Sequence, residues 1–255
     1  MDIDIKTKDL IIFDLDGTLN RSKNPVDNDI AVLILRLLAS KKVAIISGSG
    51  YKELETFFLN ALPPGSDGYN NLLLLPASGT RLLVWRGTWC EEYAEHLSPK
   101  EKERVMTALQ AGLAASGYVT PQKIYGGLVE DRGSQITFSA NGQNAPYEIK
   151  SVWDPDRNKR RKIADAISSL LPNFDVRIGG TNSIDITKRG VNKGYGIRKL
   201  EEYLHMSTEK MLFVGDKLMS GGNDYPVKAT GVDCIQVSGP GETKKLIDGW
   251  LDRLS

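Results

Sequence analysis

Two aspartates separated by one residue, Asp14 and Asp16, begin the sequence DLDGT at residues 14–18. A carboxylate at the mouth of a phosphate site can attack phosphorus and form an aspartyl phosphate. A second carboxyl group two residues later can protonate the leaving oxygen and then deprotonate the acceptor. The pattern therefore predicts a nucleophile at Asp14 and a general acid–base at Asp16, while an ordinary turn after a strand is the simpler alternative.

A second acidic segment, GDKLMSGGND at residues 215–224, contains Asp216 and Asp224. Magnesium prefers oxygen ligands and commonly takes one or two carboxylates together with phosphate and water. Placed beside Asp14, these two side chains would hold Mg²⁺, and the ion would offset the repulsion between Asp14 and an anionic substrate. Taken alone, a Gly-rich acidic segment is equally typical of a turn.

Ser47 and Lys193 complete the candidate set. A hydroxyl and an ammonium group can hold the oxygens of a phosphoryl group during its transfer, where electrostatic stabilisation is the main contribution to catalysis. Serine in turns and lysine on surfaces are common, so neither residue indicates this role alone. The order of all six residues along the chain is what favours phosphoryl transfer.

Short apolar runs alternate with segments of helical length at both ends of the chain, which predicts an α/β fold with a mostly parallel, Rossmann-like sheet covered on both faces. Asp14, Ser47 and Asp216 each follow such a run, and ligands bind beyond the carboxyl ends of the strands in these sheets. The predicted strands are 10–13, 43–46, 72–75, 211–214 and 234–237, and the predicted helices are 29–40, 194–203 and 242–254.

The middle of the chain has a different pattern. Ser98, Pro99 and Glu101 form a helix-start signal with a capping box, which predicts a helix over residues 99–115. Strand pairs and helices together predict a smaller α+β domain inserted at residues 82–187, so that residues 1–81 and 188–255 form the core. The other segments expected in the insertion are strands at 127–131, 135–139, 175–178 and 183–187 and a helix at 155–171.

Composition argues against several classes of protein. The net charge is +1, and the short basic run at 159–162 is interpreted as a solvated helix face, so neither nucleic acid nor a membrane is an expected partner. Two cysteines far apart suggest no disulfide framework, and two histidines leave little room for histidine-based zinc or triad chemistry. With no signal-peptide pattern at the first residues, a cytoplasmic protein is predicted.

In their order, these elements resemble the haloacid dehalogenase superfamily: a DxDGT loop, a strand ending in Ser47, then Lys193, and finally a GD…ND loop. The resemblance covers the entire chain. It implies a Rossmann-like core with a type-two α+β cap inserted between Ser47 and Lys193, as in subfamily IIB. It also implies that the backbone carbonyl of Asp16 is a third protein ligand of Mg²⁺, beside Asp14 and Asp216.

Within that superfamily, residues 215–225 and 179–186 are similar to segments of eukaryotic-type phosphomannomutases. This resemblance implies that Ser183 and Asp185 contact a sugar. It also implies that Arg132 and Lys150 hold the distal phosphate of the substrate. Gln143 falls where those enzymes are expected to have another arginine, and this departure weakens the case for a second phosphate site.

We therefore expect a Mg²⁺-dependent phosphohexomutase of the phosphomannomutase type that acts on a phosphosugar. A sugar-phosphate phosphatase on the same scaffold is the alternative, and a non-catalytic binding protein is disfavoured because all six core residues are present. Two further partners are left open, a hexose bisphosphate activator and a second copy of the chain bound through the cap. The sequence does not specify the sugar.

Overall fold

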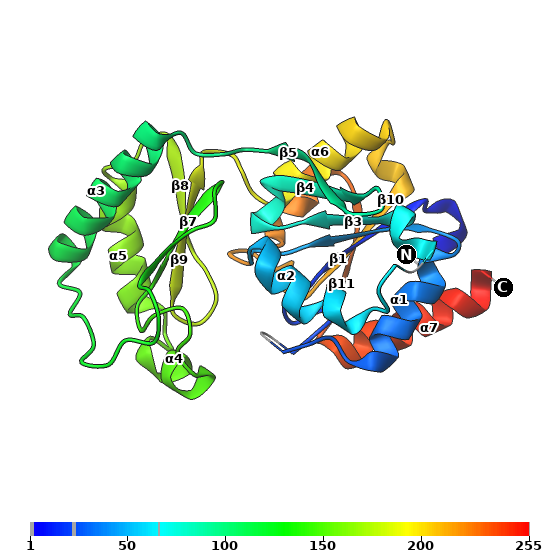
Figure 1. The fold of residues 1–255 in the computed structure, drawn as a ribbon, viewed down its shortest axis with the longest axis horizontal. Helices are drawn as coiled ribbons and strands as arrows, with labels where there is room; N and C mark the ends of the chain where they lie inside the picture. Colours follow the sequence, from blue (N-terminus) through cyan, green and yellow to red (C-terminus); the bar gives the residue numbers. More distant parts are fainter. Residues whose placement is uncertain (1–2, 22–23, 66, 255) are drawn as a thin grey trace. The chain divides into compact units, whose positions relative to one another are not determined.

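The protein is described by a computed structural model that covers residues 3–21, 24–65 and 67–254, and these residues form two compact units (Figure 1). The first unit comprises Met1–Ala94 and Asn192–Ser255, and the second comprises Glu95–Val191. The predicted insertion at residues 82–187 differs from this division at both ends. Residues 82–94 join the sheet of the first unit because apolar side chains such as Leu82 and Leu83 are buried against it. Residues 188–191 stay with the second unit.

A seven-stranded sheet forms the centre of the first unit, in the order β11-β10-β1-β2-β3-β4-β5. The first five strands in this order are parallel, and β4 and β5 are added antiparallel. The predicted α/β class with a Rossmann-like core is confirmed. The strands are β1 (Leu10–Asp14), β2 (Lys42–Ile46), β3 (Leu72–Leu75), β4 (Arg81–Trp85), β5 (Trp89–Ala94), β10 (Met211–Gly215) and β11 (Asp233–Gln236).

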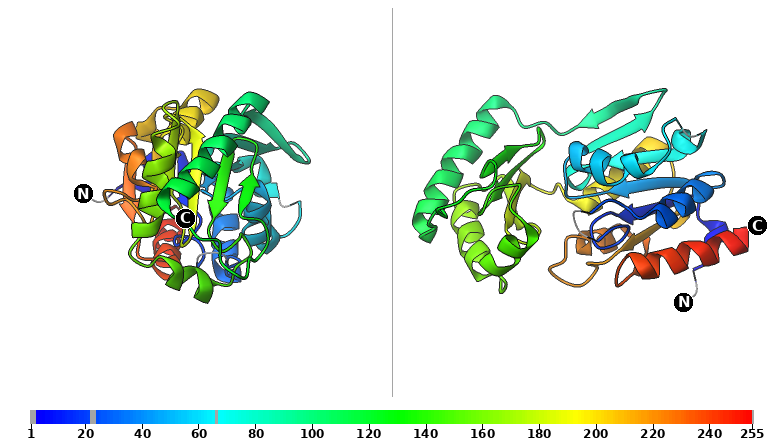
Figure 2. Two further views of the ribbon diagram at one scale, coloured as in Figure 1. Left: turned by 90° about the vertical axis from the view of Figure 1, so that its left-hand side faces the viewer. Right: turned by 60° about the horizontal axis from the view of Figure 1, so that its bottom comes forward.

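Helices cover both faces of this sheet, and the apolar residues of each strand alternate between the two faces. In β1, Ile11 and Phe13 pack with residues of α1, α2 and α7, whereas Leu10 and Ile12 pack on the side of α6. Helices α1 and α7 lie side by side on the first face (Figure 2). Burying each such side chain stabilises the fold by roughly 1.5–3 kcal/mol, so β1 is held firmly from both sides. The helices are α1 (Asn28–Leu38), α2 (Tyr51–Phe57), α6 (Lys193–Leu204) and α7 (Pro240–Leu254).

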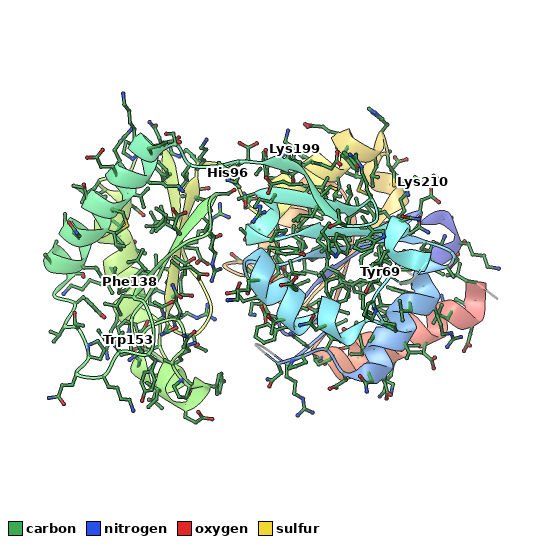
Figure 3. The ribbon with its side chains drawn as sticks, in the orientation of Figure 1. Tyr69, His96, Phe138, Trp153, Lys199 and Lys210 are labelled. Carbon is green, nitrogen blue, oxygen red and sulfur yellow. The ribbon has the colours of Figure 1, made fainter. Side chains whose placement is uncertain are left out.

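The second unit is an antiparallel sheet in the order β6-β7-β9-β8, with α3 and α5 packed on one face. Ile136 and Phe138 of β7 and Ile184 of β9 face these helices, and Phe138 lies in the core between sheet and helices (Figure 3). The alternate positions of these strands are polar and line the opposite face. The elements are α3 (Pro99–Ser116), β6 (Val129–Asp131), β7 (Gln135–Ser139), α4 (Tyr147–Trp153), α5 (Asn158–Ser168), β8 (Phe174–Ile178) and β9 (Ser183–Lys188).

Local signals set the ends of α3. The Ser98 hydroxyl accepts from the backbone of Glu101, and the Glu101 side chain accepts from the backbone of Ser98, which is the predicted capping box. The helix ends at Ser116 and is capped by Gly117, whose φ of 71° suits a residue without a side chain. Short 3₁₀ helices complete the fold: η1 (Ile5–Thr7), η2 (Leu59–Ala61), η3 (Asp67–Asn71), η4 (Ala77–Gly79), η5 (Thr208–Lys210) and η6 (Tyr225–Thr230).

Among the residues that the structure describes, no helix combines the length and apolar character needed to cross a bilayer.

Candidate active site

The carboxyl ends of neighbouring parallel strands bring the acidic residues of the first unit together. Asp14 is the last residue of β1, and Asp216 directly follows the end of β10, the strand paired with β1 on one side. Ser47 directly follows β2, which is paired with β1 on the other side. Asp14 therefore has a central place on this edge of the sheet, as the strand pattern predicted.

A buried lysine joins two of the carboxylates. The Nζ atom of Lys193 donates to Oδ1 of Asp14 and, at 2.5 Å, to Oδ1 of Asp224. All three residues are almost fully buried, at 1%, 2% and 0% exposed in that order. Lys193 is the first residue of α6, whose start is fixed by Asn192, since the side chain of Asn192 accepts from the backbone N–H of Tyr195 at 3.1 Å. The helix start thus places the ammonium group against the nucleophile candidate.

Three carboxylates in this place could hold a cation. One carboxylate oxygen from each of Asp14, Asp216 and Asp224 lies within 4.8 Å of the others. Oδ1 of Asp216 is buried and has no hydrogen-bond partner among the residues that the structure describes. An ion would satisfy this oxygen, and three oxygen ligands are the donor type that Mg²⁺ prefers. The residues present therefore fit a magnesium ion.

Gly17 is required beside this cluster for two reasons. Its φ is +92°, a backbone conformation that residues with a side chain rarely adopt. A Cβ atom at this position would lie only 2.4 Å from Oδ2 of Asp216 and 2.8 Å from its Cγ. The glycine of the DLDGT sequence thus permits the turn, as predicted, and also leaves room for the Asp216 carboxylate.

The electrostatics of the cluster favour binding of a cation. Burial is the largest influence on Asp14 and raises its pKa to about 8, against the opposing charge of Lys193. Burial lowers the pKa of Lys193, but attraction to Asp14 and Asp224 outweighs it and raises that pKa above its ordinary value. The ammonium group therefore keeps its proton, while burial opposes the negative charge of Asp14. A divalent cation would supply the missing positive charge and favour the ionised form of Asp14.

Hydroxyl groups support the two aspartates of the DLDGT sequence. Oγ1 of Thr18 donates to Oδ2 of Asp14 at 3.3 Å, and Oγ of Ser49 donates to Oδ2 of Asp16 at 3.4 Å. Ser47 is fully buried, and its Oγ accepts from the backbone N–H of Ser49 at 3.0 Å. Sequence reasoning singled out Ser47 but not Ser49. The second serine of the SGSG sequence at residues 47–50 was the available signal.

The remaining predicted site residues lie in the second unit, and the structure brings two of them into contact. Nζ of Lys150, a buried residue, donates to the backbone oxygen of Gln143 at 2.7 Å. The guanidinium of Arg132 binds Oε2 of Glu130 through Nε at 2.9 Å and Nη2 at 2.6 Å. Sequence reasoning missed Glu130, which lies on β6, whereas Arg132 directly follows the end of that strand.

Ser183 and Asp185 both lie on β9, at alternate positions that share the polar face of the second sheet. Oδ1 of Asp185 accepts from Oγ1 of Thr137 at 2.8 Å, across the β7–β9 pairing. The backbone of Gly179 approaches both residues closely: a Cβ there would lie 2.4 Å from Oγ of Ser183 and 2.7 Å from Oδ2 of Asp185. In the second unit, Lys150 thus contacts Gln143, and Ser183 and Asp185 share one face of β9, whereas Arg132 is paired with Glu130.

Solved structures with the same architecture define the class of the fold. A haloacid dehalogenase-like hydrolase from Bacteroides thetaiotaomicron superposes with a TM-score of 0.64 at 14% sequence identity, covering 97% of this chain and 100% of that chain. An IMP-bound IMP-nucleotidase from Plasmodium falciparum superposes with a TM-score of 0.68 at 17% identity, covering 96% of this chain and 68% of that chain. The fold is that of the haloacid dehalogenase superfamily.

Sequence comparison narrows the class further. The family described as eukaryotic phosphomannomutase matches residues 115–252, more than half of the chain. The chain is 25% identical to a phosphomannomutase of Saccharomyces cerevisiae over 228 residues, covering 87% of this chain and 85% of the relative. It is 22% identical to phosphomannomutase 1 of Homo sapiens over 231 residues, covering 88% and 84%. The chain belongs to the eukaryotic phosphomannomutase family.

Proposed function

We propose that the protein is a Mg²⁺-dependent phosphohexomutase that moves a phosphoryl group on a phosphosugar through an aspartyl phosphate at Asp14. The observation that carries this proposal is the buried Asp14 carboxylate at the carboxyl end of β1, held by Lys193 and grouped with Asp216 and Asp224. Family membership supports the sugar phosphate as substrate, because the matched relatives are phosphomannomutases.

The first half of the reaction forms the enzyme-bound phosphoryl group. An Asp14 oxygen attacks phosphorus as the bond between phosphorus and the leaving oxygen breaks, and Asp16 donates a proton to that oxygen. Lys193 is proposed to offset the charge that gathers near Asp14, and the Ser47 hydroxyl to bind a phosphoryl oxygen. Asp16 suits proton exchange because it is only partly buried and its carboxylate is oriented by Ser49.

The second half gives the phosphoryl group to a free hydroxyl of a sugar monophosphate, which becomes a bisphosphate, and the first half then acts on the other phosphate of that bisphosphate. Asp16, now ionised, removes the proton from that hydroxyl, whose oxygen attacks phosphorus and breaks the bond to Asp14. Asp14, Asp216, Asp224 and the backbone carbonyl of Asp16 are the proposed ligands of Mg²⁺. When bound, the ion withdraws negative charge from the phosphoryl oxygens and offsets their repulsion from Asp14.

Residues of the second unit are proposed to recognise the rest of the substrate. Ser183 and Asp185 can bind sugar hydroxyls, since each offers oxygen acceptors and Ser183 also a donor. Arg132 and Lys150 are the proposed partners of the distal phosphate, with Gln143 at a third position. A neutral amide forms a hydrogen bond there roughly half as strong as a charge-assisted one. The role of this unit as a cap that determines substrate specificity is part of the proposal.

A phosphatase is the second candidate, and Gln143 is the observation that favours it. A mutase must hold the sugar monophosphate against the phosphoaspartate until the phosphoryl group is transferred, and weaker binding of the distal phosphate lets water reach the phosphoaspartate instead. Dimerisation through the cap and a cytoplasmic location stay predictions from the resemblance and the composition.

Product analysis separates the two candidates. The protein is incubated with mannose 1-phosphate or glucose 1-phosphate, Mg²⁺ and a trace of hexose bisphosphate as activator, and both the 6-phosphate isomer and free phosphate are measured. We expect the isomer together with some free phosphate, and a smaller share of free phosphate with Gln143→Arg. Free phosphate without any isomer would replace the mutase proposal with the phosphatase.

A further inference from the structure

A buried ion pair in the second unit takes no part in the chemistry described so far. Nε of Arg160 lies 2.8 Å from Oδ2 of Asp154, and the side chains are only 3% and 0% exposed. The same Asp154 carboxylate accepts from the backbone N–H groups of Lys159 at 2.9 Å and Arg160 at 3.1 Å. Asp154 therefore satisfies the amides at the start of α5 and fixes the base of the Arg160 side chain.

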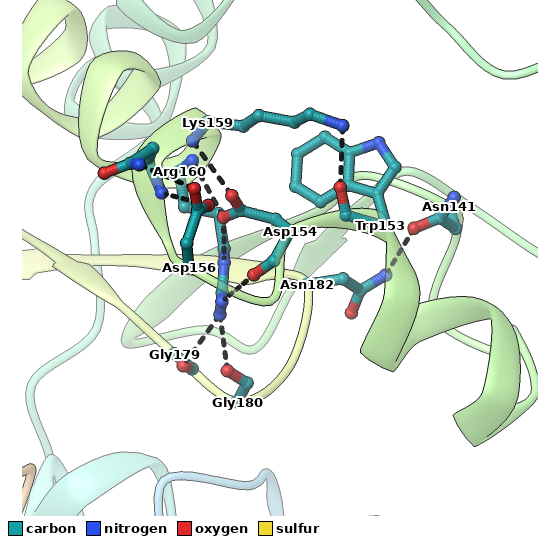
Figure 4. A network of polar contacts seen from close by, with 10 residues as sticks. Asn141, Trp153, Asp154, Asp156, Lys159, Arg160, Gly179, Gly180 and Asn182 are labelled. Atoms are coloured by element: carbon teal, nitrogen blue, oxygen red, sulfur yellow. Dashed lines mark hydrogen bonds and ion pairs between the residues drawn. The ribbon is translucent and has the colours of Figure 1, made fainter.

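The far end of Arg160 reaches a different part of the chain (Figure 4). Its Nη1 donates to the backbone oxygen of Gly180 at 2.5 Å and lies 3.5 Å from that of Gly179, while its Nη2 donates to the backbone oxygen of Asp154 at 3.0 Å. The planar guanidinium thus links α5 to the loop at residues 179–182 by hydrogen bonds that point in several fixed directions. A lysine, with a single ammonium group, cannot reproduce this geometry.

That loop directly precedes Ser183 and touches the residues proposed to bind the sugar. Gly179 has Ser183 Oγ and Asp185 Oδ2 so close to its backbone that no Cβ fits, and its N–H donates to the backbone oxygen of Ser183 at 2.9 Å. A displacement of Gly179 therefore changes the space and the hydrogen bonds available to both side chains.

The loop is also connected to the turn that carries Gln143. The backbone oxygen of Asn182 accepts from the N–H of Ala140 at 3.0 Å, and the side-chain amide of Asn182 donates to Oδ1 of Asn141 at 3.4 Å, the contact drawn in Figure 4. The turn continues to Gln143, whose backbone oxygen binds Lys150. One loop thus supports both the proposed sugar-binding and the proposed phosphate-binding residues.

We propose that Arg160, held by Asp154, is a positioning residue for substrate recognition, because it fixes the 179–182 loop and through it the placement of Ser183, Asp185 and the Gln143 turn. This inference rests on the proposed function in one respect, the role of those residues in binding the phosphosugar. The placement of the loop by Arg160 can be measured independently of any activity.

Arg160→Lys tests the inference because it keeps the positive charge and removes the planar guanidinium with its several donors. We expect the KM for mannose 1-phosphate to rise by about tenfold with kcat within about threefold, which is the pattern of lost substrate binding rather than lost chemistry. Hydrogen exchange at the backbone amides of residues 179–185 should become faster by at least about tenfold, because the loop loses its anchor. Ile167→Val, a core truncation on the same helix α5, is the matched control and should change neither quantity.

The two measurements separate this inference from the proposed function. A wild-type protein that converts no phosphohexose removes the proposed function, while hydrogen exchange still tests the loop. Unchanged exchange at residues 179–185 in Arg160→Lys, or a KM no higher than that of Ile167→Val, overturns the positioning role. If Arg160→Lys does not fold, Gly179→Ala is tested in the same assays. The Cβ added at this loop position would displace the side chains of Ser183 and Asp185 and should raise the KM in the same way.

Discussion

Gly17→Ala is a sharp test of the cluster formed by Asp14, Asp216 and Asp224. The added Cβ would lie 2.4 Å from Oδ2 of Asp216, and ordinary contacts begin at 3.4 Å, so the carboxylate must move by about 1 Å. A displacement of this size at a reacting centre costs on the order of 10²-fold in rate. The φ of +92° at Gly17 adds backbone strain of roughly 1–2 kcal/mol for alanine.

A second glycine separates the clash from the strain. Gly87 has a φ of +81°. Among the residues that the structure describes, apart from its two chain neighbours, no heavy atom lies within 4 Å of the place that a Cβ would take there, so Gly87→Ala carries similar strain without touching the site. For a chain of this size, both variants should lower Tm by about 2–8 °C. Only Gly17→Ala should lose about 10²-fold in kcat and require more Mg²⁺ for half-maximal activity.

The assay combines thermal unfolding with steady-state turnover across a Mg²⁺ titration for the wild type and both variants. A normal rate and a normal Mg²⁺ response in Gly17→Ala would refute the placement of Asp216 in the metal site. Equal rate losses in both variants would show that strain alone, and not displacement of the carboxylate, accounts for the effect.

Three further predictions concern the chemistry and the second unit. Asp14→Asn should lose several orders of magnitude in turnover while keeping its far-UV circular dichroism spectrum, because an amide cannot form the acyl phosphate; near wild-type turnover contradicts the mechanism. EDTA should abolish activity and added Mg²⁺ should restore it, measured by isomer formation; full activity in a metal-free preparation contradicts the metal site. The pKa of Asp154 is lowered in the folded protein, because burial, which raises it, is outweighed by the hydrogen bonds from Arg160 and Lys159. The stabilisation of the folded protein by ionised Asp154 should therefore be present above pH 3.8, the ordinary pKa, and be lost as the pH falls below it. Asp154→Asn should lower the free energy of unfolding by about 3–5 kcal/mol in urea at pH 7, and the stability of this variant should fall less in acid. An equal fall in acid for both proteins argues against the Asp154–Arg160 ion pair.

The sequence by itself determined the parts of the site that depend on local pattern. An apolar strand followed at once by Asp14, and another followed by Asp216, could be identified because a buried parallel strand leaves a continuous apolar run. The capping box at Ser98 and the end of α3 near Gly117 are also local, so the start and end of that helix were predictable. Family resemblance then assigned the order of the motifs to one kind of chemistry.

Only the tertiary structure decided how distant residues combine. Lys193 is 179 positions from Asp14 in the sequence, and no local sequence pattern predicts that its ammonium group binds both Asp14 and Asp224. Strands β4 and β5 belong to the first unit because they pair with β3 and with each other, and pairing partners are chosen by packing across the whole sheet rather than by the segment alone. The Arg160 guanidinium shows the same limit: a basic run at 159–162 is typical of a solvated helix face, yet Arg160 is 3% exposed. The guanidinium of Arg160 can be buried only because folding brings the Asp154 carboxylate and the carbonyl groups of the 179–182 loop within hydrogen-bond distance of it. No local sequence pattern predicts these contacts.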